Sequence, residues 1–210
     1  MADAALLARS AFTGHATPRL YGAVAAAPSV TLCEVSGLAM ASVIARKGQS
    51  AALAAAARRA FGVELPATPR RAEAQGLALT WAGPQQWLAS TGGGDSDALA
   101  RELAAAFTGL ASVTAQGDGR AVLRLSGPRA RDTLAKGLPV DLHESVFKPG
   151  DTALSLIAHM GVQITQLDAA PTYEIALMRS FAGSFWHWLT LSAGEYGYEA
   201  SAPVAASGRG

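Results

Sequence analysis

The side chains of this 210-residue chain that could do acid–base or metal chemistry are few and far apart. Its histidines are His15, His143, His159 and His187, and Cys33 is its single cysteine. Zinc sites use closely spaced His, Cys or carboxylate ligands, and no such spacing occurs here. We therefore predict no metal site and, with one cysteine, no intrachain disulfide. Cys33 stands among apolar neighbours, which favours a small core residue.

Two glycine-rich stretches could in principle form a phosphate or cation loop. Residues 92–94 are three glycines followed by Asp95, without the Lys-Ser or Lys-Thr of a P-loop and without a G-x-G-x-x-G register. Residues 117–119 (Gly-Asp-Gly) lack the further carboxylates of a calcium loop and are typical of a hairpin turn between two strands. No serine lies in a G-x-S-x-G elbow. We predict no catalytic and no cofactor-binding residue in this chain.

The charge distribution excludes one class of partner and singles out one arginine. There are 17 basic and 16 acidic residues, giving a formal net charge of +1 without a dense basic run. Nucleic-acid binding normally needs a basic patch, so we predict none. Arg124 lies in a stretch that is otherwise apolar on both faces. We expect it to pair with a specific group, in this chain or in a partner.

An aromatic run near the C-terminus, "RSFAGSFWHWLTLSAGEYGYE" (179–199), looks at first like a binding site around His187. At about 100° per helical residue, however, His187 points away from the apolar sector. Trp186 and Trp188 fall on the two margins of that sector, where tryptophan is either capped by its own chain or inserted into a partner. We predict a core helix with Trp186, Trp188 and, separately, Arg124 as partner contacts. The expected core positions are Phe181, Ala182, Phe185, Leu189 and Ala193.

The two ends of the chain are rich in Ala, Gly and Pro. We expect residues 1–28 to be poorly ordered and residues 201–210 to form a flexible tail. The first residues lack a basic start and a long apolar run, so a secretory signal is not expected. No apolar segment reaches the roughly 20 residues that span a bilayer. The expectation is a cytoplasmic protein without membrane contact.

Hydrophobic periodicity and turn residues predict the order of the elements between these ends. The first half contains two strands, a helix, a proline-containing connection (62–76), two strands around Gly83-Pro84 and a second helix. The second half repeats this order around a proline-containing loop. The expected strands are 30–35, 39–45, 77–81, 86–90, 110–115, 120–127, 152–159, 162–167 and 172–178, and the helices are 50–61, 96–107, 128–136 and 181–193.

The repeated order predicts an α+β fold built from duplicated β-α-β-β-α units. Such units form antiparallel sheets with helices packed on one face. We expect one domain over residues 29–200, divided into pseudo-repeats at about 29–110 and 111–200. The two halves share negligible identity, so this expectation rests on the order of elements.

Two stretches carry a resemblance to a known family. Residues 119–164, "GRAVLRLSGPRARDTLAKGLPVDLHESVFKPGDTALSLIAHMGVQI", and 171–199, "PTYEIALMRSFAGSFWHWLTLSAGEYGYE", resemble the gamma subunit of heterotetrameric sarcosine oxidase. "WAGPQQWLAS" and the helix after it extend the resemblance more loosely. One departure is Leu138, where the family often has a cysteine, so no redox or covalent role is expected there.

The resemblance implies a place in a complex that oxidatively demethylates sarcosine to glycine. In that family the alpha subunit holds NAD and the tetrahydrofolate site, the beta subunit carries the flavin chemistry of FAD and FMN, and the delta subunit binds zinc. The gamma subunit resembles the folate-binding fold of aminomethyltransferase and is assigned no cofactor of its own. No catalytic residue of that enzyme can be matched to a position here.

Three hypotheses for the function follow. The first is a non-catalytic structural subunit that supports the alpha, beta and delta chains. The second is a stand-alone folate-binding or one-carbon-transfer protein. The third, an accessory protein akin to folate-binding RNA-modification factors, is disfavoured by the near-neutral charge.

Overall fold

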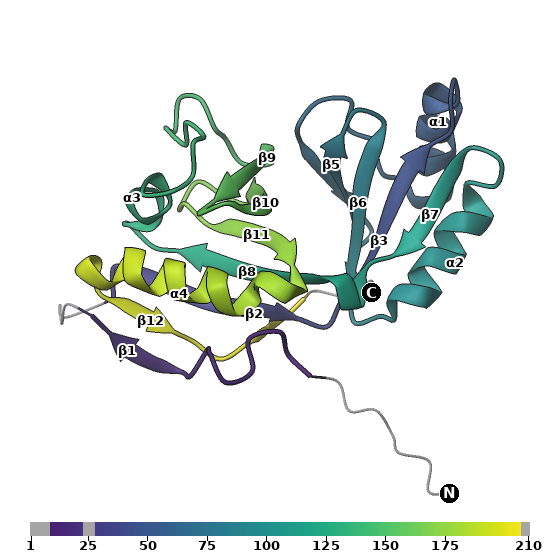
Figure 1. Cartoon of the computed structure of the whole chain (residues 1–210). Helices are drawn as coiled ribbons and strands as arrows, with labels where there is room; N and C mark the ends of the chain where they lie inside the picture. Colours follow the sequence, from purple (N-terminus) through teal and green to yellow (C-terminus); the bar gives the residue numbers. More distant parts are fainter. Residues whose placement is uncertain (1–8, 23–27, 207–210) are drawn as a thin grey trace, which may run out of the picture.

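The computed structural model describes residues 9–22 and 28–206, which fold into two sheets with helices on their outer sides (Figure 1). Every neighbouring pair of strands in the smaller sheet is antiparallel. Helices α1 (Ser50–Phe61) and α2 (Ser96–Ala106) belong to this half. In spatial order its strands are β4 (Arg71–Ala74), β5 (Leu77–Gly83), β6 (Gln86–Gly92), β3 (Leu38–Ala45) and β7 (Ala111–Ala115).

The larger sheet is mostly antiparallel and is accompanied by α3 (Ala130–Ala135) and α4 (Ala182–Ala193). Its exceptions are β12 and β13, which run parallel to β2. Short 3₁₀ turns occur at η1 (Gly117–Gly119), η2 (Arg179–Phe181) and η3 (Gly194–Tyr196). In spatial order the strands are β1 (Arg19–Tyr21), β12 (Tyr198–Ala200), β2 (Val30–Ser36), β8 (Arg120–Ser126), β11 (Tyr173–Met178), β10 (Met160–Gln166) and β9 (Thr152–Ile157), and β13 (Val204–Ala205) also pairs with β2.

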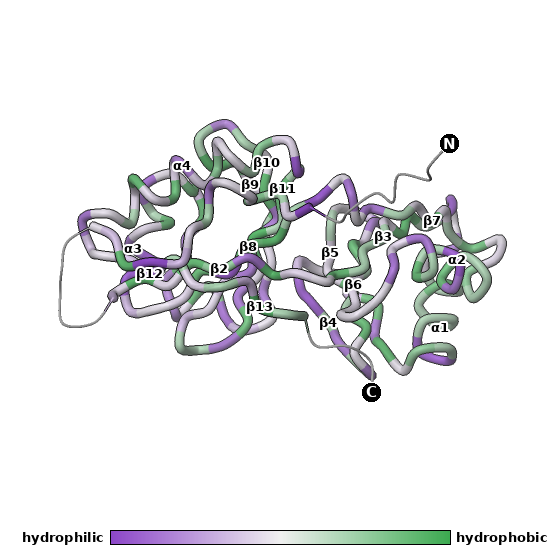
Figure 2. The backbone as a smooth tube through the Cα atoms, turned by 90° about the horizontal axis from the view of Figure 1, so that it is seen from below, coloured by the Kyte–Doolittle hydropathy of each residue, from purple (hydrophilic) through white to green (hydrophobic). Residues whose placement is uncertain are grey.

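Each sheet buries one face against its own helices, and the hydrophobic stretches run through both halves (Figure 2). In the smaller half, Leu53 of α1 and Leu103 of α2 share a core with Val43 and Leu79. In the larger half, Phe185 of α4 lies in a core with Leu123 of β8. Successive strand residues face opposite sides of a sheet, so these apolar positions recur at every second residue.

The opposite faces of the two sheets meet each other, with a much smaller apolar contact between them. That contact is formed by five buried side chains, two from the smaller sheet and three from the larger. The chain therefore has four layers, helices, sheet, sheet and helices, with helices on one face of each sheet. The five side chains are Val35, Met40, Leu88, Val122 and Ala176.

The predicted α+β fold with two antiparallel sheets is confirmed, and the duplication is visible in the strand order. From β3 and from β8 the chain runs in the same way: strand, helix, three strands, helix, strand. The orders β4-β5-β6-β3 and β9-β10-β11-β8 match strand for strand. The sheets do not divide the chain at residues 110 and 111, because β2 joins the larger sheet and β7 the smaller. In the larger sheet, β2 lies next to β8. In the smaller sheet, the equivalent position next to β3 is occupied by β7.

The predicted hairpin at residues 117–119 is wrong. β7 pairs with β3 in the smaller sheet, whereas β8 pairs with β2 and β11 in the larger one. The Gly-Asp-Gly segment is the 3₁₀ turn η1, which carries the chain from one sheet to the other. The composition of a turn predicts only that the chain bends locally. Which strands the two flanking strands pair with depends on the sheet edges that are available elsewhere in the fold.

Three further segments differ from the sequence expectations. Residues 71–74 form the edge strand β4, which the sequence did not reveal because Ala and Glu have low strand propensity. Residues 9–22, expected to be poorly ordered, hold β1 and the fully buried Phe12. Part of the expected flexible tail forms β13, which pairs with β2. The expectations for residues 1–8, 23–27 and 207–210 lie outside the described residues.

Candidate functional site

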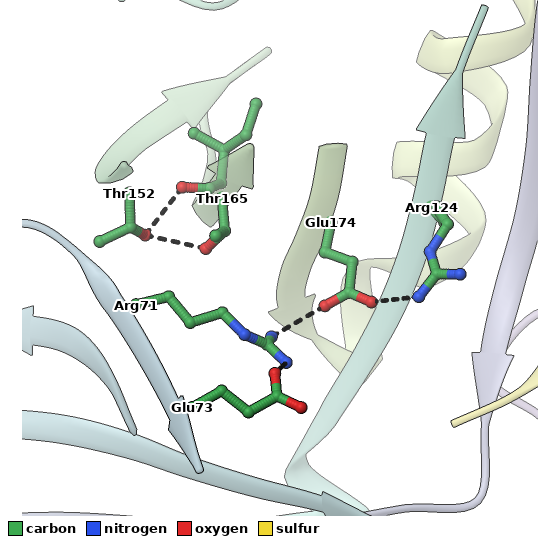
Figure 3. Close-up of polar contacts among 7 residues, drawn as sticks. Arg71, Glu73, Arg124, Thr152, Thr165 and Glu174 are labelled. Carbon is green, nitrogen blue, oxygen red and sulfur yellow. Dashed lines mark hydrogen bonds and ion pairs between the residues drawn. The ribbon is translucent and has the colours of Figure 1, made fainter. Parts of the chain in front are cut away.

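Charged side chains from both sheets meet in the space between the two inner faces (Figure 3). Glu174 of β11 lies between two arginines, with its Oε1 2.6 Å from Arg124 Nη2 and its Oε2 3.1 Å from Arg71 Nη1. Arg71 Nη2 also lies 2.9 Å from Glu73 Oε2. Because Arg71 belongs to the smaller sheet and Glu174 to the larger, this ion pair joins the sheets. We call Arg71, Glu73, Arg124 and Glu174 the inter-sheet cluster.

Strand alternation explains why these residues meet. In β8, Leu123 and Leu125 face the helices, so Arg124 faces the other sheet. Glu174 is the residue directly opposite Arg124 in the antiparallel pairing of β8 with β11. Opposite charges at such directly paired positions stabilise a sheet. The expectation that Arg124 pairs with a specific group is met within this chain, by Glu174.

Uncharged polar groups on the inner face of the larger sheet bond to one another, and one of them reaches the smaller sheet. The Thr165 hydroxyl lies 3.0 Å from the Thr152 hydroxyl, which donates to the carbonyl of Ile164 at 2.8 Å (Figure 3). Gln163 Nε2 donates across the sheets to the carbonyl of Trp81 at 2.7 Å. Besides the apolar contact, the inner faces are therefore joined by the Gln163–Trp81 hydrogen bond and the Arg71–Glu174 ion pair.

Backbone groups hold the sheets together at the start of β4 and β9. The Arg71 N–H donates to the Gly150 carbonyl at 2.8 Å, and the Thr152 N–H donates to the Pro69 carbonyl at 3.0 Å. Arg70 forms an ion pair with Asp151 beside these bonds. Direct backbone bonds of this kind fix the spacing of the two sheets at this end.

A cavity of about 390 Å³ opens beside the inter-sheet cluster. The four cluster residues line it together with Ser90, Thr91 and Gln166, and the apolar part of the lining includes Leu38 and Leu167. Four buried side-chain atoms in the described residues have no hydrogen-bond partner, and three of them belong to residues of this lining. These three are Thr91 Oγ1, Arg124 Nε and Gln166 Oε1.

The fourth such atom, Arg120 Nε, belongs to a different hollow of about 750 Å³. That hollow lies between the N-terminal segment, the end of β2 and the start of α2, and Arg9 and Arg179 also line it. Burial lowers the pKa of Arg120 from its usual value. Asp95 and Asp97 at the start of α2 also line this hollow.

The aromatic helix lies in the larger core as the periodicity predicts, with one exception. His187 is exposed and lines neither of the two hollows described above. Phe185 and Leu189 are fully buried, but Phe181 is 42% exposed. Phe181 belongs to the 3₁₀ turn before α4, so the α-helical angle does not apply to it.

The two tryptophans on the margins of this helix differ in their surroundings. Trp186 is only 7% exposed and contacts the ring of Phe12 from the N-terminal segment, at 5.9 Å between centroids. Trp188 is half-buried, packs on Phe185, and lies close against Gly137 after α3. A partner could therefore reach Trp188 directly, whereas its own chain covers Trp186.

The remaining residues that drew attention in the sequence do not belong to the inter-sheet cluster, although Cys33 lies directly opposite Arg124 in the pairing of β2 with β8. Cys33 is buried, and this burial raises the pKa of its thiol although nearby Arg124 acts in the opposite direction. His143 Nδ1 lies 2.7 Å from Ser145 Oγ in an exposed loop. Leu138 is a buried core residue. Among residues 9–22 and 28–206, no group of three or more His, Cys, Asp or Glu side chains is placed to hold a metal ion, and no helix could span a membrane.

Sequence inspection found Arg124 but missed its partners. Glu174 carries the same signal as Arg124, a charge inside the apolar strand "TYEIALM". Arg71 and Glu73 lie in the segment interpreted as a connection, so their shared face could not be inferred. Thr91 and Gln166 carry no local signal, because their position beside the cavity depends on how the two sheets face each other.

Comparison with known proteins identifies relatives of the chain. Residues 45–195 match the model of the sarcosine oxidase, gamma subunit family. The chain is 30% identical over 164 residues to a sarcosine oxidase subunit gamma from Arthrobacter sp., covering 78% of this chain and 79% of the relative.

Solved structures agree with this comparison. A chain of the heterotetrameric sarcosine oxidase from Corynebacterium sp. U-96, in complex with pyrrole 2-carboxylate, superposes with a TM-score of 0.78 and 28% identity. That match covers 91% of this chain and 97% of the other. The glycine cleavage system aminomethyltransferase T from Bartonella henselae has a TM-score of 0.56 at 18% identity, covering 80% of this chain and 49% of that one, and shares the fold.

Proposed function

The chain belongs to the sarcosine oxidase gamma subunit family, and we propose that it is the non-catalytic structural subunit of a heterotetrameric sarcosine oxidase. One observation carries the proposal: the match to a chain of a heterotetrameric enzyme extends over 91% of this chain and 97% of that one. A chain that matches one subunit over almost its full length is suited to the same place in a complex.

The chemistry of the complex belongs to the partner subunits in this proposal. The alpha and beta subunits would carry FAD, FMN, NAD and tetrahydrofolate, and the delta subunit would carry zinc. In this proposal the oxidative demethylation of sarcosine to glycine would take place at the cofactors of the partner subunits. The inter-sheet cluster supports a structural role for this chain, because Glu174 is bonded to Arg71 and Arg124 and provides no free general base.

The outer side of α4 is the surface that we propose for contact with the other subunits. Leu191 is 68% exposed and lies one helical turn from His187, which is also exposed. The half-buried Trp188 lies beside them, so an apolar and aromatic strip faces outward from a rigid helix. Tryptophan with one accessible edge is frequent at the energetic centres of interfaces.

Co-expression of the four subunits tests the proposal. We expect the alpha, beta, gamma and delta chains to co-elute in size-exclusion chromatography and to oxidise sarcosine. Omission of this chain should lower the yield of the assembled complex, with the flavin spectrum of any remaining complex unchanged. A fully assembled and active complex without this chain would contradict the proposal.

A titration separates this role from that of a stand-alone folate-binding protein. Calorimetry of the isolated full chain with tetrahydrofolate should give no heat of binding. Saturable binding by the isolated chain would support the stand-alone function instead.

A further inference from the structure

Part of the inner face of the larger sheet is not covered by the smaller sheet. Leu154 and Leu156 of β9 are 49% and 54% exposed, and Met178 of β11 is 45% exposed, although all three are large and apolar. Gly161 is also exposed and belongs to β10, the strand between β9 and β11. We call Leu154, Leu156, Gly161 and Met178 the uncovered face.

The strand register shows that these side chains belong to the inner side of the sheet. Leu154 lies directly opposite Gln163, whose side chain bonds to the smaller sheet. Leu156 lies two residues further along β9, and residues two apart in a strand share a side. Met178 lies two residues after Ala176, which takes part in the apolar contact between the sheets. The uncovered face therefore continues the inner face beyond the end of that contact.

Gly161 makes the centre of the uncovered face low. Leu156 lies directly opposite Gly161 on one side. On the other side Val162 pairs with Leu177, so Gly161 is level with Met178 in this antiparallel pairing. A Cβ atom added to Gly161 would meet no atom within 4 Å. An apolar side chain from another protein could thus rest on Gly161 and contact Leu156 and Met178 together.

A half-buried arginine stands at the end of the same row of residues. Arg120 of β8 lies directly opposite Met178. None of the ion pairs among residues 9–22 and 28–206 includes it, and Asp95 and Asp97, which line the same hollow, form no ion pair with it. A partly desolvated guanidinium is stabilised by a carboxylate. The charge beside the uncovered face therefore favours an acidic partner.

The other sheet edges of the protein are protected in ways that β9 is not. Sheet edges are commonly protected by charged side chains. β1 carries Arg19, and β4 carries Arg71 and Glu73. The exposed side chains of β7 are the polar Ser112 and Thr114. β9, "TALSLI", has no charge, and its two exposed side chains are leucines, as expected for an edge that another protein covers.

The charges argue against a second copy of this chain as the occupant. A symmetric contact would place the uncovered face of one copy against that of the other. Residues 152–157 contain no acidic residue, and the neighbouring Asp151 is already paired with Arg70. Arg120 would therefore gain no carboxylate from a second copy, so the occupant that fits is a different chain.

We infer that the uncovered face docks a segment of another subunit, which places an apolar side chain over Gly161 and a carboxylate at Arg120. Strands β9, β10, β11 and β8 follow one another in the sheet. Neighbouring strands lie about 4.8 Å apart, so the row from Leu156 to Arg120 is about 14 Å long, the length of about five extended residues. Helix α4 packs on the opposite side of this sheet, so the chain would contact its partners through two opposite surfaces. This inference rests on the proposed function as a subunit of a complex.

Competition between variant and wild-type chains tests the inference in the assembled complex. Both chains are co-expressed with the alpha, beta and delta subunits, and mass spectrometry of the purified complex gives the ratio in which they are incorporated. Leu156→Glu places a charge on the uncovered face and should lower this ratio about tenfold, as for an energetically important interface residue. Leu20→Glu is the matched control, because Leu20 is 63% exposed on β1 at the opposite edge of the same sheet. Its ratio should stay close to that of the wild type.

Gly161→Leu separates docking from folding. The added side chain meets open space in the isolated chain, and leucine suits a strand better than glycine does, so the melting temperature should not fall. In the complex the same side chain would occupy the position of the partner's apolar residue. Incorporation should therefore also fall about tenfold, the effect of losing one important contact.

Arg120→Gln and Arg120→Lys test the predicted carboxylate. Arg120 forms no ion pair in the described part of the chain, so neither variant should lower the melting temperature of the isolated chain. Arg120→Gln removes the charge and should reduce incorporation, whereas Arg120→Lys keeps the charge and should retain most of it. Equal incorporation of both variants would remove the carboxylate from the proposal.

The outcomes distinguish this inference from the proposed function. If the wild-type chain does not enter the complex, the proposed function fails and this inference fails with it. If the wild-type chain enters and Leu156→Glu and Gly161→Leu enter equally well, only this inference is refuted. A dimer of the isolated chain that Leu156→Glu dissociates would assign the uncovered face to a second copy and would also overturn it.

Discussion

The two faces of each sheet in this protein are built from different chemistry. The helix-facing sides form two large apolar cores around residues such as Leu103 and Phe185. The sides that face each other share five buried apolar side chains, and they are also joined by the Arg71–Glu174 ion pair, the Gln163–Trp81 hydrogen bond and backbone bonds beside β4 and β9. Both kinds of face come from the same strands, through alternate residues.

This difference shows that one face of each sheet mainly stabilises the fold, whereas the other face carries the polar cavity. Apolar burial contributes about 25 cal/mol per Å² and has no directional requirement, so the helix-facing cores supply most of the folding free energy. Ion pairs and hydrogen bonds contribute little net free energy but require defined geometry. The inter-sheet face therefore sets how the halves sit together, and it is the place where a polar cavity can persist.

The largest expected loss of stability comes from truncating a large side chain in a helix-facing core. Phe185→Ala should lower the free energy of unfolding by about 3–5 kcal/mol, because it leaves a cavity under α4. Guanidinium chloride denaturation measures the change. Leu191→Ala, on the exposed side of the same helix, is the control and should have little effect. Similar losses from both variants would show that α4 is not packed as described.

A smaller effect is expected from the inter-sheet face. Glu174→Gln removes the carboxylate that two arginines share and should lower the free energy of unfolding by about 2 kcal/mol, less than for a fully buried pair because the arginines are partly solvated. The loss should shrink in high salt, which screens charges. Glu64→Gln at an exposed ion pair should change stability little. If the two variants behave alike, the inter-sheet cluster does not join the halves.

The two tryptophans give a ranking that separates folding from assembly. Trp186→Ala empties a buried core position and should destabilise the isolated chain more than Trp188→Ala, which should cost about 1–2 kcal/mol at a half-buried site. Assembly should rank the two variants in the opposite order. Trp188→Ala should reduce co-elution with the partner subunits more than Trp186→Ala does, relative to the stability that each variant loses. Thermal melting and size-exclusion chromatography measure the two quantities. If Trp186→Ala has the larger effect on both the melting temperature and co-elution, Trp188 does not belong to the proposed interface.

The smallest effect concerns the thiol beside the inter-sheet cluster. Burial raises the pKa of Cys33, so less thiolate is present at a given pH than in an exposed cysteine. Labelling with iodoacetamide at pH 8 should be slow in the folded chain and should accelerate on unfolding. A folded-state rate close to that of free cysteine would show that this strand opens readily.

Much of the fold could be predicted from local patterns. The alternation in "RAVLRLS" and the stripe Leu99, Leu103 and Phe107 predict a strand and a helix that the structure contains. β4 could not be predicted in this way, because its residues favour other conformations and its pairing with β5 holds them extended. The prediction of a hairpin at 117–119 was wrong because the pairing of each flanking strand is decided by strands far away in the sequence.

The sequence by itself determined the alternation of elements, the duplicated order, the family resemblance and the isolated charge of Arg124. These features follow from interactions between neighbouring residues, from side-chain periodicity and from composition. Only the tertiary structure decided that Glu174, Arg71 and Glu73 meet Arg124, that Phe12 covers Trp186, and that Thr91 and Gln166 line one cavity. Such contacts join residues that are far apart in the chain, and the packing of the two sheets selects them in a way that no local pattern specifies.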